Sequence, residues 1–303
     1  MSSPIVVGVA LREDDAAPIA LGRDLAALTD AALALVHAYP YEQPSAVPGP
    51  VRVSELRTRS IAALERLADP LRDKVEVTAR AGTAASPAAV LHDAAAALQA
   101  PLIVVGSTHR GRVGRVMPGS VTARLLQGSD RAVAVVPRGY VGAAIRRIGA
   151  AFVDTPEGRD ALAAATVAAR LCGGTVRAFT VHDAAPPASA FAVPGWGGLE
   201  AVEEARRDRD AAPAERAREL IPPDVLDGVE VLAGHPGDAL IEVSKELDLL
   251  VCGSRGFGPL HAVVRGGVSR ALVDGAACPV LVVPHGAGGR IERLVRGRAS
   301  VEG

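Results

Sequence analysis

Glycine and serine residues gather between two short apolar runs, in a stretch whose composition suits the binding of an anion. Leu249–Pro284 reads LLVCGSRGFGPLHAVVRGGVSRALVDGAACPVLVVP. The two runs are typical of buried parallel strands, and a helix is expected between them over Val268–Val273, with Gly275 as its stop. A glycine-rich loop ahead of a helix presents backbone N–H groups to a phosphate, and the helix dipole adds positive potential. This stretch is therefore a candidate phosphate site.

The same pattern occurs a second time in the chain. Leu102–Pro137 reads LIVVGSTHRGRVGRVMPGSVTARLLQGSDRAVAVVP. A spacing held over more than 30 residues indicates an internal duplication, because chance similarity does not keep one register. Three pairs of residues keep a spacing of 147 residues: Gly106 and Gly253, Gly119 and Gly266, Pro137 and Pro284.

Length and composition agree with two domains in one chain. The 303 residues suffice for two units of about 150 residues each. The net charge of −1 supplies no broad field for nucleic acid or a membrane surface, so neither partner is expected. No signal peptide and no apolar run of 18 residues stand out, and Cys172, Cys252 and Cys278 are isolated. We expect a soluble cytoplasmic protein with reduced thiols.

Strands and helices are expected to alternate in each half, which predicts a parallel sheet with helices on both faces. We expect a first domain over 1–141, a second over 146–286, and a disordered tail over 287–303. The expected elements include strands over 75–80, 148–153, 229–233 and 249–252, a helix over 87–98 capped by Ser86, and helices over 158–171, 199–220 and 238–246.

A short linker between duplicated halves favours an intramolecular pseudo-dimer with a rough two-fold axis. The apolar strands that end the two repeats, Val133–Val136 and Val280–Val283, are expected at the shared interface. A homodimer of whole chains is a further expectation of the same kind. The proline- and glycine-rich loops over 39–50 and 182–198 interrupt each half, and the second contains the aromatic residues Phe191 and Trp196. We expect these two aromatics to cover a ligand, to pack on the body of the domain, or to pack on the partner half.

Both halves resemble universal stress protein domains over residues 4–285. The family's hallmark, G-x2-G-x9-G-[ST], is matched in the second half by Gly253, Gly256 and Gly266, with Gly267 at the hydroxyl position. In the first half His109 stands where the second glycine is expected. The resemblance implies two tandem Rossmann-like domains, each a five-stranded parallel sheet of order 3-2-1-4-5 with helices on both faces. It also implies a fifth strand that serves as a dimer surface.

Members of this family divide into those that bind ATP and those that do not. The resemblance implies that an acidic residue at the end of the first strand holds adenine or ribose. Asp154 matches it in the second half, whereas the first half has Ala10. We therefore favour the second half as the site for ATP, with Mg²⁺ accompanying it. The candidate nucleotide-binding residues are Asp154, Gly253, Ser254, Arg255, Gly256, Gly266, Gly267, Val268 and Ser269.

The first half offers a weaker candidate site. Its hydroxyls persist, but the acidic residue is missing and a histidine side chain narrows the phosphate loop. Its residues are Gly106, Ser107, Thr108, His109, Gly119, Ser120, Val121 and Thr122.

Each of these features also has a purely structural explanation. Glycines after a strand often serve tight packing alone, and Asp154 could simply cap the following helix. Catalytic constellations are missing: the sequence has no Walker A motif and no G-x-S-x-G elbow, and its seven histidines lack metal-ligand spacing. Slow ATP hydrolysis is the most that the residues suggest, and a nucleotide-using enzyme is the weakest alternative.

Two functions stay open on this evidence. The first is an adenine-nucleotide-binding regulator of a stress or dormancy response. The second is a nucleotide-free dimeric scaffold that binds an unidentified partner protein. The retained glycine loops favour the first, and the missing acid and hydroxyl favour the second.

Overall fold

The computed structural model describes residues 3–12, 15–39, 50–107, 120–182, 211–254, 267–287 and 289–291. The proline-rich segments expected as loops lie largely outside these residues, together with Phe191 and Trp196 and most of the expected tail. In the first half, strands and helices alternate as β1 (Ile5–Gly8), α1 (Ala16–Thr29), β2 (Leu33–Ala38), α2 (Pro50–Ala68), β3 (Val77–Gly82), α3 (Pro87–Ala97), β4 (Leu102–Gly106), α4 (Ser120–Gly128) and β5 (Ala132–Val136).

The second half repeats this alternation. Its elements are β6 (Arg147–Ala151), α5 (Pro156–Cys172), β7 (Thr175–His182), a helix over 211–220, β8 (Leu226–Ala233), α7 (Pro236–Val243), β9 (Leu249–Ser254), α8 (Val268–Gly275) and β10 (Val280–Pro284). No helix among the described residues is long and apolar enough to cross a membrane.

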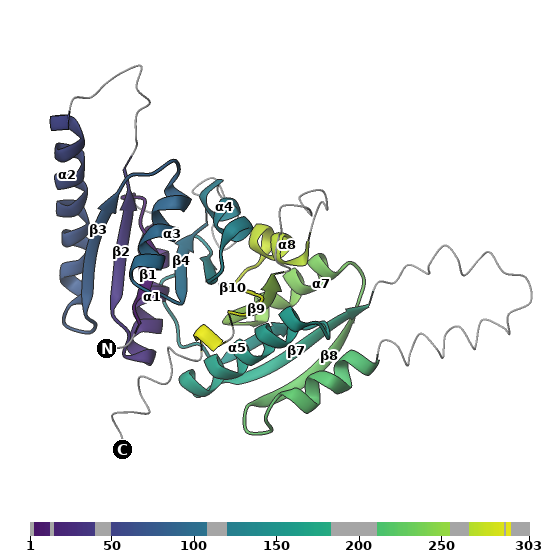
Figure 1. Ribbon diagram of the computed structural model, residues 1–303. Helices are drawn as coiled ribbons and strands as arrows, with labels where there is room; N and C mark the ends of the chain where they lie inside the picture. The colour runs from purple at the N-terminus through teal and green to yellow at the C-terminus, as the bar shows by residue number, and fades with distance from the viewer. Residues whose placement is uncertain are drawn as a thin grey trace, which may run out of the picture.

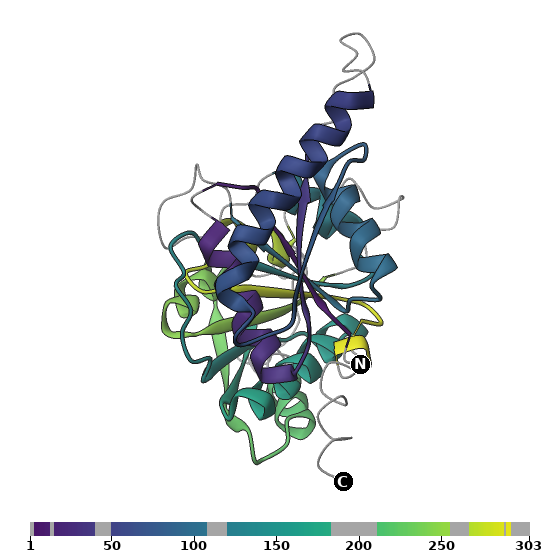
Figure 2. The same cartoon turned by 90° about the vertical axis from the view of Figure 1, so that its left-hand side faces the viewer.

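The ten strands in the described part of the chain form one sheet, in the order β3-β2-β1-β4-β5-β10-β9-β6-β7-β8. Each half contributes a parallel sheet of order 3-2-1-4-5, as the resemblance implied. The halves join where β5 and β10 pair antiparallel, with Ala134 opposite Leu281. The expectation that the two terminal strands meet at a shared interface is therefore confirmed. Figures 1 and 2 show that the strands of the two halves cross at a large angle, as the twist of so wide a sheet requires.

Aliphatic side chains fill two cores, one on each face of the sheet. The core on one face contains buried residues of α1, α2, α5 and the helix over 211–220. The core on the other face is built from the sheet together with α3, α4, α7 and α8. Because every strand except the outermost two has strand neighbours on both sides and helices on both faces, its residues are almost continuously apolar.

Several expected boundaries need correction. The strand expected over 148–153 ends at Ala151, and the strand expected to end at Cys252 continues to Ser254, which pairs with Pro284. The strand expected over 75–80 runs over Val77–Gly82, in register with all six residues of β2. Neighbouring strands fix these ends through their pairing, which the apolar pattern of a single strand does not report.

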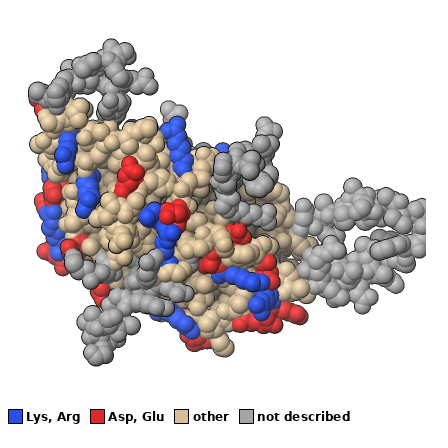
Figure 3. All heavy atoms as spheres, viewed as in Figure 1, with Lys and Arg blue, Asp and Glu red and all other residues tan. Residues whose placement is uncertain are grey.

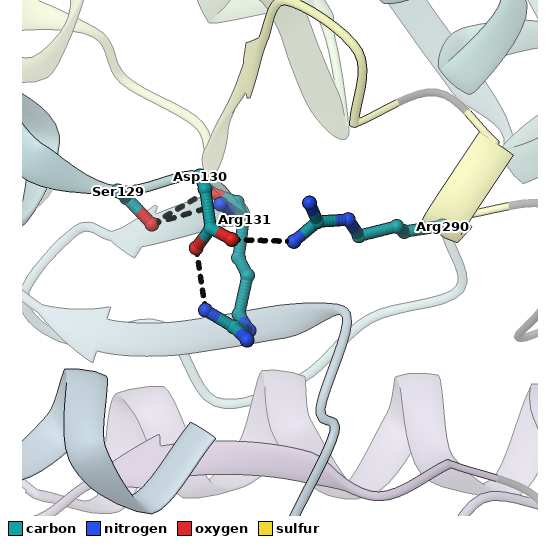
Figure 4. A network of polar contacts seen from close by, with 4 residues as sticks. All are labelled: Ser129, Asp130, Arg131 and Arg290. Carbon is teal, nitrogen blue, oxygen red and sulfur yellow. Dashed lines mark hydrogen bonds and ion pairs between the residues drawn. The ribbon is translucent and has the colours of Figure 1, made fainter. Parts of the chain in front are cut away.

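The C-terminal turn over 289–291 ties the second half to the first. The Arg290 guanidinium donates to Asp130 at 2.7 Å, and Asp130 also pairs with Arg131. Ser129 Oγ donates to the Arg131 carbonyl oxygen at 2.8 Å and accepts from its backbone N–H at 3.1 Å (Figure 4). Beside this network the Ile291 side chain is 8% exposed, and it closes a small apolar cavity of about 60 Å³ between the helices α1 and α5.

Candidate functional site

The candidate site of the second half lies at the carboxyl edge of two neighbouring strands. β6 and β9 pair in parallel, with Ala151 opposite Cys252. Asp154 follows the first of these strands, and Gly253 and Ser254 end the second. The structure thus brings three of the predicted site residues to one edge of the sheet, which is where open α/β sheets bind ligands. Arg255, Gly256 and Gly266 lie outside the described residues.

The helix α8 begins directly after the predicted glycine loop. Gly267 is its N-cap, with an extended backbone and no side-chain cap, and Val268 and Ser269 open the first turn. The first amides of a helix have no carbonyl partner within the helix, so they are free to donate to a ligand. Among the described residues, a Cβ placed on Gly267 would meet only Ser269 Oγ, at 4.0 Å. The described part of the chain therefore leaves space open at the N-terminus of α8.

Asp154 does not cap the following helix. That role belongs to Thr155, whose hydroxyl accepts from the Gly158 backbone N–H at 3.2 Å. The Asp154 carboxylate instead accepts from Arg159 Nε at 2.7 Å. This hydrogen bond lowers the pKa of Asp154, so the carboxylate stays ionised and available as an acceptor. Sequence reasoning missed Arg159, which is the direct partner of the predicted acid.

The strand register makes Val153, and not Asp154, the residue equivalent to Ala10. Ile5 pairs with Leu102, and Ile148 pairs with Leu249, so the first strands of the two halves are offset by 143 residues. Val153 is then the equivalent of Ala10, and Asp154 lies one residue further along. Val153 is 56% exposed, which is unusual for a large apolar residue in this chain. An exposed apolar side chain beside an ionised acid could contact the flat face of a base.

Gly253 has a packing reason to be glycine. A Cβ at this position would lie 2.7 Å from the backbone oxygen of Glu157 in the first turn of α5. The end of β9 passes this close to α5 only because no side chain intervenes. At the equivalent Gly106 a Cβ would meet Pro18 at 3.4 Å, an ordinary contact. Packing thus explains the hallmark glycine Gly253, whereas the described residues around Gly106 impose no such steric requirement.

The first-half candidate site is less open where the structure describes it. Thr122 is 2% exposed, and the Ser107 hydroxyl is buried without a hydrogen-bond partner among the described residues. Val121 is half-buried, and Ser120 is the first residue of α4. The Thr122 side chain is too buried to reach a ligand in solvent, which supports our preference for the second half. Thr108, His109 and Gly119 lie outside the described residues.

The three thiols show the burial that the sequence suggested for two of them. Cys252 and Cys278 are buried, Cys172 is half-buried, and none forms a disulfide. Burial raises the pKa of Cys252 and of Cys278 to about 12. No cluster of three or more histidine, cysteine or acidic side chains suited to a metal ion occurs in the described ranges.

Comparison with known proteins places the chain in a family. The sequence pattern of the Universal stress protein family matches residues 1–137 and again residues 144–284. The chain therefore belongs to the universal stress protein family and carries two of its domains in tandem.

Individual relatives agree with this assignment. The universal stress protein Rv2005c of Mycobacterium tuberculosis is 28% identical over 198 residues, which is 61% of this chain. The match spans 62% of the length of that relative. The universal stress protein Rv2319c of the same organism is 27% identical over 247 residues, 76% of this chain and 80% of its own length. A universal stress protein structure from Archaeoglobus fulgidus superimposes with a TM-score of 0.67 at 17% identity, covering 94% of this chain and all of that one.

Proposed function

We propose that the chain is an adenine-nucleotide-binding regulator of a stress or dormancy response, and that its second half holds ATP together with Mg²⁺. The observation that carries the proposal is the open N-terminus of α8 beside the carboxyl edge of β6 and β9. Its free amides suit the phosphates. Asp154, ionised and exposed at the same edge, suits the ribose or the adenine amino group, and Val153 suits the face of the base.

Arg159 has a defined part in this proposal. Its hydrogen bond to Asp154 holds one carboxylate oxygen, Oδ1, and leaves Oδ2 available to the ligand. The guanidinium is therefore a positioning group for the acid and competes with the nucleotide only if both need the same oxygen. Replacing Arg159 by glutamine separates these alternatives, because it frees the whole carboxylate without removing it.

Calorimetric titration of ATP with Mg²⁺ tests the site. We expect Asp154→Ala to weaken binding by about 1–3 kcal/mol, the cost of a lost charge-assisted hydrogen bond. We expect Gly256→His to weaken it as well, since it copies the first half. Gly267→Ser should tighten it by about 1 kcal/mol, because the added hydroxyl has room and supplies the family's phosphate contact.

A first-half variant controls for binding elsewhere. Ser120→Ala should leave the affinity for ATP unchanged. Equal affinity in the wild type and in the three second-half variants would contradict the proposal, as would binding abolished by Ser120→Ala alone.

A scaffold that binds partner proteins without nucleotide is the second candidate. The specific observation in its favour is that two hallmark features already have structural partners: Asp154 pairs with Arg159, and Gly253 makes room for α5. Native mass spectrometry of protein purified without added nucleotide distinguishes the two functions. A bound adenine nucleotide supports the first, whereas a bare chain that also fails to bind ATP in the titration supports the scaffold.

A further inference from the structure

A pocket of about 360 Å³ lies at the outer edge of the first half, far along the sheet from the candidate nucleotide site. β3 is the outermost strand there, with α2 on one face and α3 on the other. The pocket is lined by all three elements and by the residue that follows the strand, Thr83. Figure 3 shows separate basic and acidic groups on a mostly uncharged surface over this part of the molecule.

The floor of the pocket carries free backbone groups. The carbonyl oxygens of Glu76 and Gly82 accept from the N–H groups of Leu33, in β2, and of Tyr39, which follows it. The alternate residues of β3 therefore turn their peptide groups outward. Ala79 and Ala81 are two of these alternate residues, and both line the pocket. No strand pairs with this edge of β3 in the described chain. Their peptide groups are therefore available to a ligand.

Two arginines line the pocket without ion-pair partners in the part of the chain that the structure describes. Arg57 projects from α2 and Arg80 from β3, and both are exposed. Many other arginines of the protein, such as Arg147 and Arg170, hold a carboxylate within 3.1 Å. Asp93, from α3, lines the same pocket and reduces its formal charge to +1. That charge matches one carboxylate better than a doubly charged phosphate.

An unsatisfied hydroxyl and an apolar wall complete the pocket. Thr83 Oγ1 is buried and has no hydrogen-bond partner among the described residues, an arrangement that native proteins rarely keep without a ligand or water. Val36, Ile61 and Val90 contribute apolar surface. A mostly apolar lining with a few convergent polar groups is typical of small-molecule sites of this volume.

We propose that this pocket binds a small monocarboxylic acid with an aliphatic body and a hydroxyl group. The carboxylate lies between Arg57 and Arg80, whose planar guanidiniums match its two oxygens. The hydroxyl hydrogen-bonds Asp93 or Thr83, and the aliphatic chain covers the apolar wall. This ligand and this site are independent of the nucleotide proposed for the second half.

The second half differs in charge at the position of Arg80, which supplies a natural comparison. Arg80 pairs in register with Val36, and the equivalent residue of the second half, Phe179, pairs with Glu230. An exposed glutamate thus stands where the first half has its arginine. A glutamate at this position would repel a carboxylate, and Arg80→Glu copies the second half there.

Titration of the ¹⁵N-labelled full chain with 2-hydroxyhexanoate, followed by amide chemical shifts, tests the proposal. We expect saturable shifts of the Ala79, Ala81 and Thr83 amides with a Kd of about 1 mM. Arg57→Glu and Arg80→Glu should each weaken binding about tenfold or more. Arg59→Glu is the matched control: it removes an exposed arginine of α2 that does not line the pocket, and should leave the Kd unchanged.

Other probes test which chemical groups of the ligand the pocket recognises. Hexan-2-ol, which has the chain and hydroxyl but no charge, should bind at least tenfold more weakly. The assignment is overturned if hexan-2-ol or hexyl phosphate binds more tightly than the acid, or if Arg80→Glu leaves the shifts unchanged. Shifts caused by an acetylated Val-Glu-Val peptide, with no response to the acid, would overturn it in favour of strand addition to β3.

Discussion

At the scale of single residues, the two halves use equivalent glycines differently. Gly253 lies where the end of β9 passes the first turn of α5, and a Cβ there would be 2.7 Å from a backbone oxygen. A backbone atom cannot move aside as the end of a flexible side chain can. Within the described chain, a Cβ on Gly106 would meet only the ring of Pro18, at an ordinary distance. The glycine at this position of the hallmark therefore meets a steric requirement in the second half only.

We predict that Gly253→Ala lowers the free energy of unfolding by about 1–3 kcal/mol, because β9 or α5 must shift to admit the methyl group. Gly106→Ala, its matched control, should change stability by no more than about 0.5 kcal/mol. Urea denaturation followed by circular dichroism measures both. Equal losses in the two variants would show that the contact with Glu157 does not set the cost.

We predict a clear order of thiol reactivity. Burial raises the pKa of Cys252 and Cys278 to about 12, so almost no thiolate exists at pH 8 and no reagent reaches it. Cys172 is half-buried, and burial raises its pKa as well, so it should react more slowly than a free thiol but ahead of the other two. Labelling with iodoacetamide and mass analysis gives the order. Labelling of Cys252 before Cys172 in the native protein would contradict it, and labelling in urea is the control.

Residue types at the candidate site could be read from the sequence, but their partners could not. Asp154 and the glycines stood out by type and spacing. The pairing of Asp154 with Arg159 depends on where α5 begins, and Thr155 rather than Asp154 turned out to cap that helix. The equivalence of Ala10 with Val153 depends on strand register, which only the pairing of β1 and β6 with their neighbours reveals.

At the scale of elements, strands and helices were predictable in order and less so in their ends. Ser86 was expected to cap α3, and its hydroxyl does accept from the Ala89 backbone N–H at 3.3 Å. Helix caps have a local chemical signature of this kind. Strand ends have no such signature. The sequence therefore did not show that β9 extends past Cys252 to pair with the last residues of β10.

The helical turn over 289–291 is an element that apolar periodicity did not indicate, because its three described residues are too few to show a period. It is anchored by the pair of Arg290 with Asp130 (Figure 4). Partial burial would raise the pKa of Asp130, but the hydrogen bond from Arg290 and the charges of Arg131 and Arg290 outweigh it, and the pKa is lowered. A carboxyl whose pKa is lower in the folded state stabilises the fold at pH values above its unfolded pKa.

We predict that Arg290→Gln lowers the free energy of unfolding by about 0.5 kcal/mol at pH 7, the usual worth of an exposed ion pair. The difference from wild type should shrink as the pH falls below about 4, where Asp130 becomes protonated in the unfolded chain and then in the folded one. Urea midpoints between pH 7 and pH 3 measure this trend. A difference that stays constant over that range would assign the effect of Arg290 to packing, and Arg59→Gln serves as the exposed control.

At the scale of the whole molecule, the two halves join in one continuous sheet. Two parallel sheets related by a two-fold axis can pair their last strands only antiparallel, and β5 and β10 do so. The apolar sequences of these strands predicted their burial. The formation of one continuous sheet could not be predicted, because packing face to face would bury the same residues. The structure shows that the edges pair, so neither half leaves its last strand open.

We predict that the halves stay associated when the chain between them is cut. Val141 is 84% exposed in the connection between β5 and β6, so a protease recognition sequence inserted after it should be cleaved in the folded protein. The strand pair, the apolar contact of α1 with α5 and the Arg290 link then hold the halves without a covalent bond. Native mass spectrometry should show one particle with a mass close to that of the intact chain.

Leu281→Ala is the variant that weakens the junction, because it removes buried apolar contact at a cost of about 2–5 kcal/mol. In the cut protein it should release separate halves at concentrations where the cut wild type remains whole. Separation of the cut wild type under the same conditions would mean that the short connection, and not the shared sheet, keeps the halves together.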